Sequence, residues 1–375
     1  MREGDFFIPR FPQGEISAGD SVHPSQMARE SKRAIAENSY LHLKPGVTLT
    51  KRGASYTLGL PTHGICIEEP LQVQMVRSLN GRQTLREISR GLMWELPLLM
   101  DFARTLSEAG LIDEAPLPLE LPSPKNGDLS AELMRARLSA ELSLLTHRTS
   151  HSGGGRDEFA DRAHFRILIS GETRLARHLL VAMHASGFTS TRLIPRAHLP
   201  HHLTSDDVCG IVVRPEDIGK LRSTFTDDLI RGAQISKPEV DAGVRPDLII
   251  STVPIEWDYI QRWMSEGSLH LQINQIIGRE IEIGPLVMPG RDPCLRCVRL
   301  TKGDNGTDVS HEYIRSQAPT AAISYISGLI ALAIGEYFAT GESLLRATSH
   351  WYDLLAPLRA PDIRHWNFHP ECGCQ

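Results

Sequence analysis

Four of the six cysteines lie in two tight pairs that are far apart along the chain, Cys294 with Cys297 and Cys372 with Cys374. Zinc takes about four soft ligands in a tetrahedron, and one close pair supplies half of that shell. Two distant pairs therefore predict a zinc site that ties the end of the chain to its middle. Four thiolates leave no open position for water or substrate, so we expect a structural ion. The alternatives are four ordinary reduced thiols or disulfides, and a bridge between Cys372 and Cys374 would be strained.

The composition is that of a soluble globular protein with more than one domain. The chain has 375 residues, is 41% hydrophobic and 23% charged, and carries a net charge of -5, which offers no basic surface to nucleic acid. The charged N-terminus is not followed by an apolar signal segment. The apolar stretch 321–339 contains Ser, Gly and Glu, so it predicts a buried helix rather than a membrane span. We therefore expect a cytoplasmic protein with no nucleic-acid or membrane partner.

The first third of the chain divides into an arm and a small domain. Residues 1–38 are polar, contain Pro and Gly, and show no sustained periodicity, which indicates a flexible arm. Residues 39–115 contain apolar patches around Pro45-Gly46, over 55–60 and over 64–67, and these predict three short strands.

Three helices are predicted to follow these strands. The first spans 70–79 and stops at Asn80-Gly81, and the capping box Thr84-Leu-Arg-Glu87 opens the second. The third begins near Pro97 and has three apolar side chains on one face, Leu99, Phe102 and Leu106. Three strands and three helices in this length predict a small winged-helix-like α+β domain.

The rest of the chain predicts an α/β domain after a connecting segment. Residues 116–160 hold a proline-rich linker, a helix at 129–145 and a flexible joint at 150–155. Residues 161–375 alternate between strand and helix patterns, which is typical of a Rossmann-like parallel sheet. The predicted strands are 166–170, 191–194, 210–213, 247–253, 269–274 and 281–288, with a helix over 173–186.

The turn after the first of these strands is where such a fold would bind a nucleotide. A phosphate-binding turn needs glycines so that backbone N–H groups approach the phosphates, but the segment Ser170–Ala176 has Gly171 alone and adds Glu172. The next strand runs into Ile194-Pro195-Arg196, without the acidic residue that ribose hydroxyls require. We therefore predict no nucleotide-binding residues, and no catalytic residues can be assembled from the sequence.

The small domain can be interpreted as a peptide-binding module. Its third helix sets Arg104 against Asp101 and Glu108, which disfavours DNA recognition. The strand at 64–67 can accept an added strand along its edge, and the third helix offers apolar side chains beside it. The candidate peptide contacts are Ile65, Cys66, Ile67 and Phe102. The alternative is an inert packing module.

Several segments together resemble known families. Leu43-Lys-Pro-Gly-Val47 and Leu79–Thr84 resemble the PqqD-type precursor-peptide recognition domain of ribosomal natural-product pathways. Gly284-Pro-Leu-Val-Met-Pro-Gly290, which runs into Pro293-Cys-Leu-Arg-Cys297, and the ending His369-Pro-Glu-Cys-Gly-Cys374 resemble the ThiF-related partner proteins of YcaO cyclodehydratases. The resemblance covers residues 41–375.

The resemblance implies a function in peptide modification. A protein of this kind binds the leader of a ribosomal precursor peptide and presents it to a YcaO enzyme, which uses ATP to cyclise Cys, Ser or Thr. It implies that the four paired cysteines hold a structural zinc ion, and it leaves a homodimer open. A competing interpretation is an ATP-dependent ThiF-type adenylyltransferase that acts on a peptide or carrier-protein C-terminus. The segment Ile250–Pro254 lacks the acidic residue that working enzymes of that type carry there. A winged-helix transcription factor is a third alternative.

Overall fold

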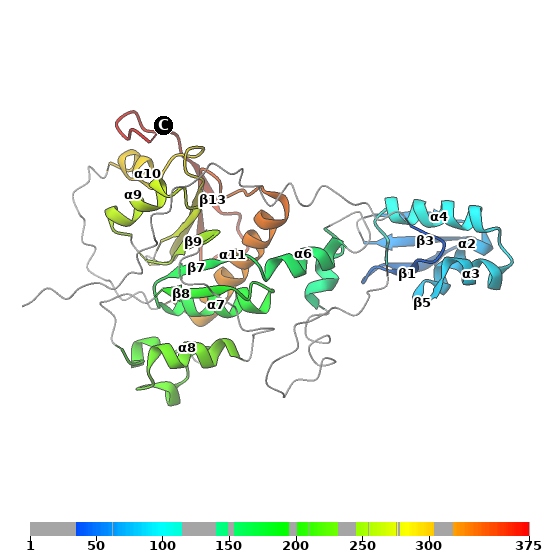
Figure 1. Ribbon diagram of the computed structural model, residues 1–375, viewed down its shortest axis with the longest axis horizontal. Helices are drawn as coiled ribbons and strands as arrows, with labels where there is room; N and C mark the ends of the chain where they lie inside the picture. Colours follow the sequence, from blue (N-terminus) through cyan, green and yellow to red (C-terminus); the bar gives the residue numbers. More distant parts are fainter. Residues whose placement is uncertain are drawn as a thin grey trace, which may run out of the picture. The chain divides into compact units, whose positions relative to one another are not determined.

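The computed structural model describes residues 35–61, 63–114, 140–148, 154–194, 201–209, 211–231, 245–253, 255–274, 276, 278–303 and 318–374. They form two compact units, one within residues 28–161 and the other within residues 162–375, and each is described by itself (Figure 1). Most of the predicted arm, the predicted linker, the first part of the predicted helix at 129–145 and most of the joint at 150–155 lie outside the described residues.

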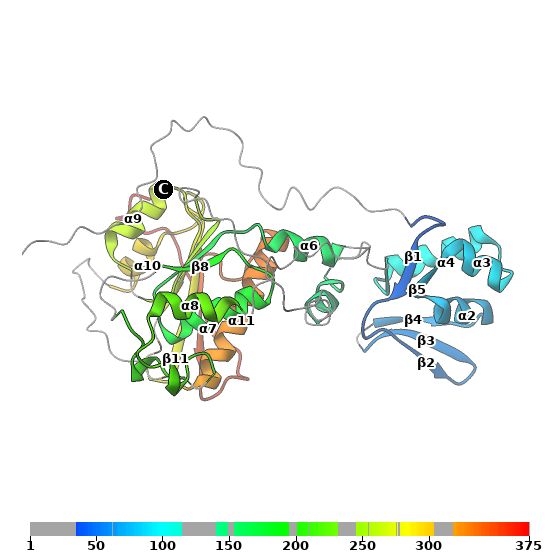
Figure 2. The same cartoon turned by 60° about the horizontal axis from the view of Figure 1, so that its bottom comes forward.

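The smaller unit contains two three-stranded antiparallel sheets in its described part. The first has the order β5-β1-β6 and the second the order β2-β3-β4. Figure 2 shows β2, β3 and β4 lying in sequence beside one another. The strands are β1 (Tyr40–Leu43), β2 (Thr48–Arg52), β3 (Ser55–Leu60), β4 (His63–Ile67), β5 (Asn80–Thr84) and β6 (Ile112–Glu114).

Three helices accompany these sheets, α2 (Pro70–Ser78), α3 (Leu85–Leu92) and α4 (Leu96–Glu108). The predicted capping box is present: Glu87 N–H donates to Thr84 Oγ1 at 3.2 Å, and Thr84 N–H donates to Glu87 Oε2 at 2.8 Å. The predicted apolar face of α4 is buried in the core of this unit. The local patterns therefore place the first helix within one residue of α2 at both ends, and the starts of the second and third within one residue of the starts of α3 and α4.

The strands of the smaller unit differ from the prediction in three places, one of which is the unpredicted strand β6. The pattern around Pro45-Gly46 is two strands, because Gly46 adopts φ +82° and Val47 N–H donates to the carbonyl of Lys44 at 3.1 Å, which reverses the chain. Residues 80–84 follow α2 as β5 rather than as a simple stop. The residues of that strand are polar and show no apolar alternation. The strand forms because its backbone pairs with β1. The winged-helix comparison stays a prediction.

The larger unit is built on one seven-stranded mixed sheet in the order β13-β12-β11-β10-β9-β7-β8. Strands β8, β7, β9 and β10 are parallel, which confirms the parallel sheet that the alternation of strand and helix patterns predicted. Strands β11, β12 and β13 extend the sheet antiparallel. The strands are β7 (Ile167–Ser170), β8 (Thr191–Ile194), β9 (Leu248–Ser251), β10 (His270–Ile273), β11 (Glu280–Val287), β12 (Thr348–Asp353) and β13 (Asp362–His365).

Helices α7 and α11 pack against each other and against this sheet in the main core. Within the described residues, α11 has the length and a mean hydropathy of 1.5 that would suit a membrane span, and half of its apolar window is buried in this unit. The helices are α7 (Arg174–Ala185), α8 (Arg222–Arg231), α9 (Trp257–Ser265), α10 (Leu295–Thr301) and α11 (Thr320–Thr340), with one-turn 3-10 helices η1 (Ser205–Asp207) and η2 (Pro215–Asp217). Helix α6 (Gly154–Arg162) crosses the boundary between the two units, which falls between residues 161 and 162.

The strand predicted at 210–213 is wrong for its described residues. Residues 211–213 form bends, and Cys209 N–H donates to the carbonyl of Val213 at 3.0 Å across them. Val212 and Val213 are buried in a small cluster with Leu203 and Phe225 instead of in the sheet. The apolar run that suggested a strand therefore reflects burial in a loop.

Candidate functional site

The two cysteine pairs meet in the larger unit. The Sγ atoms of Cys294, Cys297, Cys372 and Cys374 all lie within 4.8 Å of one another. Three of the separations are 4.0 Å, 3.3 Å and 3.4 Å, between Cys294 and Cys297, Cys294 and Cys372, and Cys297 and Cys374. A tetrahedral ion about 2.3 Å from each sulfur would separate the sulfurs by about 3.8 Å. The cluster therefore has the spacing and the donor set of a structural metal site.

Local backbone geometry brings the cysteines together. Cys294 is the N-cap of α10, so Cys297 follows one turn later on the same side of the helix. Gly373 adopts φ +68° between the two C-terminal cysteines, and the Cys372 N–H donates to the carbonyl of His369 at 3.0 Å. His369 contributes its backbone N–H, which donates to Cys297 Sγ at 3.3 Å.

Burial favours the neutral thiol at two of the four cysteines. Burial raises the pKa of the Cys294 thiol to about 11 and raises the pKa of Cys372 further. Burial acts in the same direction on Cys374, but hydrogen bonds from Cys294 and Cys297 lower the pKa of that thiol overall. A metal ion supplies the positive charge that lets all four sulfurs ligate as thiolates.

The turn between β7 and α7 is filled by side chains of the chain itself. Gly171 adopts φ +103°, and a Cβ there would lie 3.1 Å from Thr252 Oγ1 and from both methyl groups of Val253. Thr173 caps α7 by accepting the Ala176 N–H at 3.1 Å, and its Oγ1 lies 3.2 Å from Thr252 Oγ1. One of the first donors of the helix, the Ala176 N–H, therefore already has an intramolecular partner at the place where a phosphate would lie.

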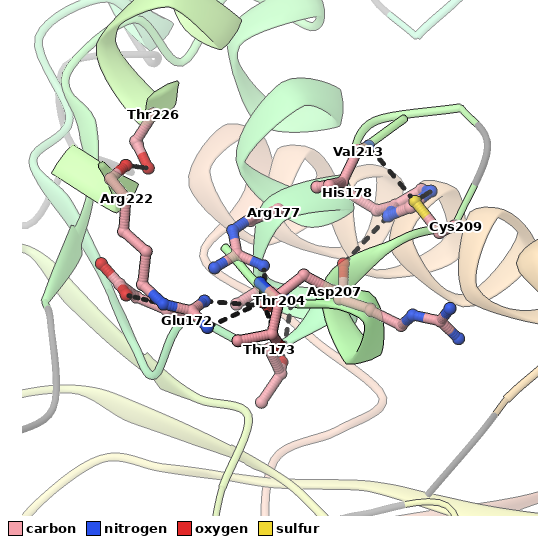
Figure 3. Close-up of polar contacts among 12 residues, drawn as sticks. Glu172, Thr173, Arg177, His178, Thr204, Asp207, Cys209, Val213, Arg222 and Thr226 are labelled. Atoms are coloured by element: carbon pink, nitrogen blue, oxygen red, sulfur yellow. Dashed lines mark hydrogen bonds and ion pairs between the residues drawn. The ribbon is translucent and has the colours of Figure 1, made fainter. Parts of the chain in front are cut away.

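A buried ionic network lies beside this turn (Figure 3). Asp207 accepts from Arg177 Nη1 at 2.8 Å and from Arg222 Nη1 and Nη2 at 2.8 Å and 2.7 Å. Arg222 Nε also lies 3.9 Å from Glu172 Oε2. Burial alone would raise the pKa of Asp207, but the hydrogen bonds from Arg222, from the Thr204 N–H and from Arg177 lower it below its ordinary value. Glu172 and Arg222 therefore form an ion pair at the place where a nucleotide-binding turn would direct its backbone N–H groups toward a phosphate.

The predicted peptide contacts lie in different environments. The side chains of Ile67 and Phe102 are buried at 0% and 9% exposure, Ile65 is half-buried, and Cys66 is exposed. Ile65 and Ile67 pair with Leu58 and Tyr56 of β3 on the face that packs on the core. Substitution of Ile67 would therefore disturb the fold before it disturbed any bound peptide. Of the four, Cys66 is the residue whose side chain a peptide can reach.

The backbone of β4 offers a free edge. Among the described strands β4 pairs with β3 alone. The register pairs Leu60 with His63, which leaves two residues in the hairpin loop and makes this a hydrogen-bonded pair. Alternation then predicts that the N–H and C=O groups of Gly64 and Cys66 point away from β3, toward the open side of the strand.

The grouping of Arg177, Asp207 and Arg222 could not be predicted from the sequence. The three lie up to 45 positions apart, as their numbering shows, and each has an ordinary local context. The one available signal was the Thr204–Asp207 spacing, in which Asp207 accepts the backbone N–H of Thr204 at 2.8 Å. Their convergence depends on tertiary packing.

Comparison with known proteins identifies the fold. No known protein family and no curated protein matches the sequence. The structure is similar to that of E. coli MccB in complex with MccA-N7isoASN, with a TM-score of 0.59 and 12% identity over 89% of this chain and 99% of that chain. MccB with ATP gives a TM-score of 0.58, at the same identity and coverage.

The structure of the heterocyclase TruD is a second kind of neighbour, with a TM-score of 0.54 and 13% identity over 90% of this chain and 42% of that chain. At these identities the likeness concerns the fold. The chain is a mixed α/β protein with a large mixed sheet, and it has the fold that MccB and the matched part of TruD share.

Proposed function

We propose that this chain is a ThiF-like protein that binds the leader of a ribosomally made precursor peptide. The observation that carries the proposal is the likeness to MccB, which was solved with MccA-N7isoASN and, as the microcin C7 biosynthetic enzyme, with N-formylated MccA. That likeness extends over 89% of this chain, so it includes more than the α/β unit. The PqqD-like sequence of the smaller unit supports the same function.

The binding surface in this proposal is the free edge of β4. An added strand gains affinity from main-chain hydrogen bonds, and pockets for alternate side chains give specificity. Gly64 and Cys66 present their backbone groups to that edge, while Ile65 and Ile67 anchor the strand to the core beneath it. A leader peptide would therefore bind without rearrangement of the smaller unit.

The chain then presents the peptide to a separate YcaO cyclodehydratase. TruD is a heterocyclase, and this chain corresponds to 42% of it, so a heterocyclase built around this chain would need the remainder from another protein. The turn at 170–173 supports the view that this chain does not bind a nucleotide. Its residues Glu172 and Thr173 contact the side chains of Arg222 and Thr252 instead. In this proposal the partner supplies ATP-dependent ring formation.

Reconstitution tests this proposal. The purified chain, a YcaO enzyme and a candidate precursor peptide taken from the neighbouring genes, and ATP are combined, and mass spectrometry follows the loss of one water for each ring formed. We expect rings when all components are present, and little product when this chain is left out or when the precursor lacks its leader. Equal ring formation without this chain would overturn the proposal.

A second candidate is a ThiF-type adenylyltransferase, which the MccB structure with ATP favours because the match covers 99% of that chain. ATP–pyrophosphate exchange by the isolated chain separates the two functions. We expect no exchange with or without precursor, whereas exchange that depends on the precursor would establish the alternative.

The four-cysteine cluster would hold a zinc ion in this protein. Four thiolates fill the coordination shell, so the ion would fix the C-terminus against α10 rather than take part in chemistry. A homodimer also stays a prediction, which light scattering of the purified chain tests.

A further inference from the structure

Cys209 and His178 form a thiol–imidazole pair in the larger unit, outside the cysteine cluster and the β7–α7 turn. Cys209 lies in the loop after η1, and His178 is on α7, as Figure 3 shows. Cys209 Sγ lies 3.9 Å from His178 Nε2. The sequence analysis had no signal for this contact, because the two residues are 31 positions apart.

The hydrogen bonds of His178 define its tautomer. Nδ1 lies 2.9 Å from the carbonyl oxygen of Arg174, which can accept but cannot donate. Nδ1 therefore carries the ring proton, and Nε2 presents its lone pair to the thiol. Burial lowers the pKa of His178 and the nearby guanidiniums of Arg174 and Arg177 act in the same direction, against the hydrogen bond to the Arg174 carbonyl, so the ring is neutral at neutral pH and the Nε2 lone pair is free.

The loop holds the sulfur in place and leaves Cys209 half-buried. The Val213 N–H donates to Cys209 Sγ at 3.4 Å, a contact that strengthens when the sulfur becomes a thiolate. Thr320 Oγ1 donates to the carbonyl of Cys209 at 2.7 Å, which fixes the backbone. His178 is buried at 6% exposure, whereas Cys209 is half-buried. Cys209 is therefore the more exposed member of the pair, while the imidazole is shielded from water.

We infer that Cys209 is a nucleophilic thiol that His178 activates as general base, and that it is a modification site for small uncharged carbon electrophiles. In the reaction the thiol proton moves to His178 Nε2 and a sulfur lone pair forms the new S–C bond. The bond from carbon to its leaving group breaks, and the leaving group takes the electron pair. The imidazolium then returns its proton to solvent. This inference is independent of peptide binding.

Iodoacetamide is the probe, and peptide mapping by mass spectrometry measures the alkylation rate of each cysteine at neutral pH in the zinc-supplemented protein. Each rate is divided by the rate of the same cysteine in urea, which removes differences of local sequence. Cys66 is the internal reference, because it is exposed and makes no contact with a histidine within the described part of the chain. Exposure alone predicts that Cys66 reacts faster than Cys209.

We expect the normalised rate of Cys209 to exceed that of Cys66 by about tenfold, below the usual effect of a general base because the sulfur–nitrogen contact is long. In His178→Asn the amide can still donate to the Arg174 carbonyl, but nothing reaches Sγ, so the Cys209 rate should fall about tenfold while the Cys66 rate stays constant. A normalised Cys209 rate at or below that of Cys66 in the wild-type protein overturns the inference, whether or not the variant folds. An unchanged Cys209 rate in a folded His178→Asn protein also overturns it.

Discussion

Replacing Asp207 with alanine removes a carboxylate that two buried guanidiniums share. Asp207 accepts three hydrogen bonds from Arg177 and Arg222, and the side chains of the two arginines are 1% and 7% exposed. Breaking a buried ion pair by removing one partner costs about 3–5 kcal/mol, because the remaining charge stays buried. For a unit of this size that loss lowers the melting temperature by roughly 6–20 °C.

Asp217 supplies a matched control for this substitution. Like Asp207, it closes a one-turn 3-10 helix and accepts the backbone N–H of the N-cap residue, here Arg214 at 2.8 Å. Its cationic partner is Lys220, whose side chain is 54% exposed. Asp217→Ala therefore loses a helix cap and an ion pair with an exposed lysine, and should lower the free energy of unfolding by about 1 kcal/mol.

Urea unfolding followed by tryptophan fluorescence measures both variants. Of the five tryptophans, Trp94 lies in the smaller unit and the other four lie in the larger one, so the signal reports mainly on the larger unit. The pKa of Asp207 lies below its ordinary value, so its stabilisation is fully present at neutral pH and is lost as the pH falls through the pKa of the folded state. Equal destabilisation by Asp207→Ala and Asp217→Ala at neutral pH would refute the reasoning.

Three further predictions concern the metal cluster, a buried histidine and the β7–α7 turn. Cys374→Ser should lower bound zinc, measured by atomic emission, and the melting temperature together; a purified wild-type protein without metal would contradict this. Burial lowers the pKa of His270 to about 4 from an ordinary 6.5, so unfolding free energy should fall as the pH drops from about 6.5 to 4, and His270→Gln should flatten that dependence. Gly171→Ala should lower the free energy of unfolding by about 2–3 kcal/mol, because the added Cβ makes close contacts as well as straining the backbone. Gly219→Ala is the control, at φ +87° with nothing within 4 Å of an added Cβ, and should lower it by about 1 kcal/mol in the same urea assay.

Patterns that depend on local chemistry could be predicted from the sequence. The Thr84–Glu87 capping box and the apolar face of α4 involve residues within one or two turns of each other, so their spacing determines the structure. The cysteine quartet was predictable across the 78 positions between Cys294 and Cys372 because a metal site requires a fixed number of soft ligands.

Features that depend on tertiary pairing could not be predicted. Strand β5 consists of polar residues that extend because they pair with β1, and Val212 and Val213 line a small loop cluster rather than a strand. The Asp207 network and the pair of His178 with Cys209 join side chains from different elements. Each residue looks ordinary in its own segment, so the sequence alone offers no reason to combine them.

The most direct test of the central claim is leader binding at the free edge of β4, measured by fluorescence polarisation. The probe is the fluorescein-labelled N-terminal segment of any short Cys/Ser/Thr-rich peptide that a neighbouring gene encodes, together with versions that are N-methylated at one position each. We predict that Cys66→Ser binds like the wild type, because it keeps the backbone N–H, and that Cys66→Pro loses affinity while its melting temperature shows that it remains folded. We also predict that N-methylation weakens binding at alternate positions of the leader, as an added strand requires. Full affinity of a folded Cys66→Pro protein, with no alternation among the methylated peptides, would contradict the account.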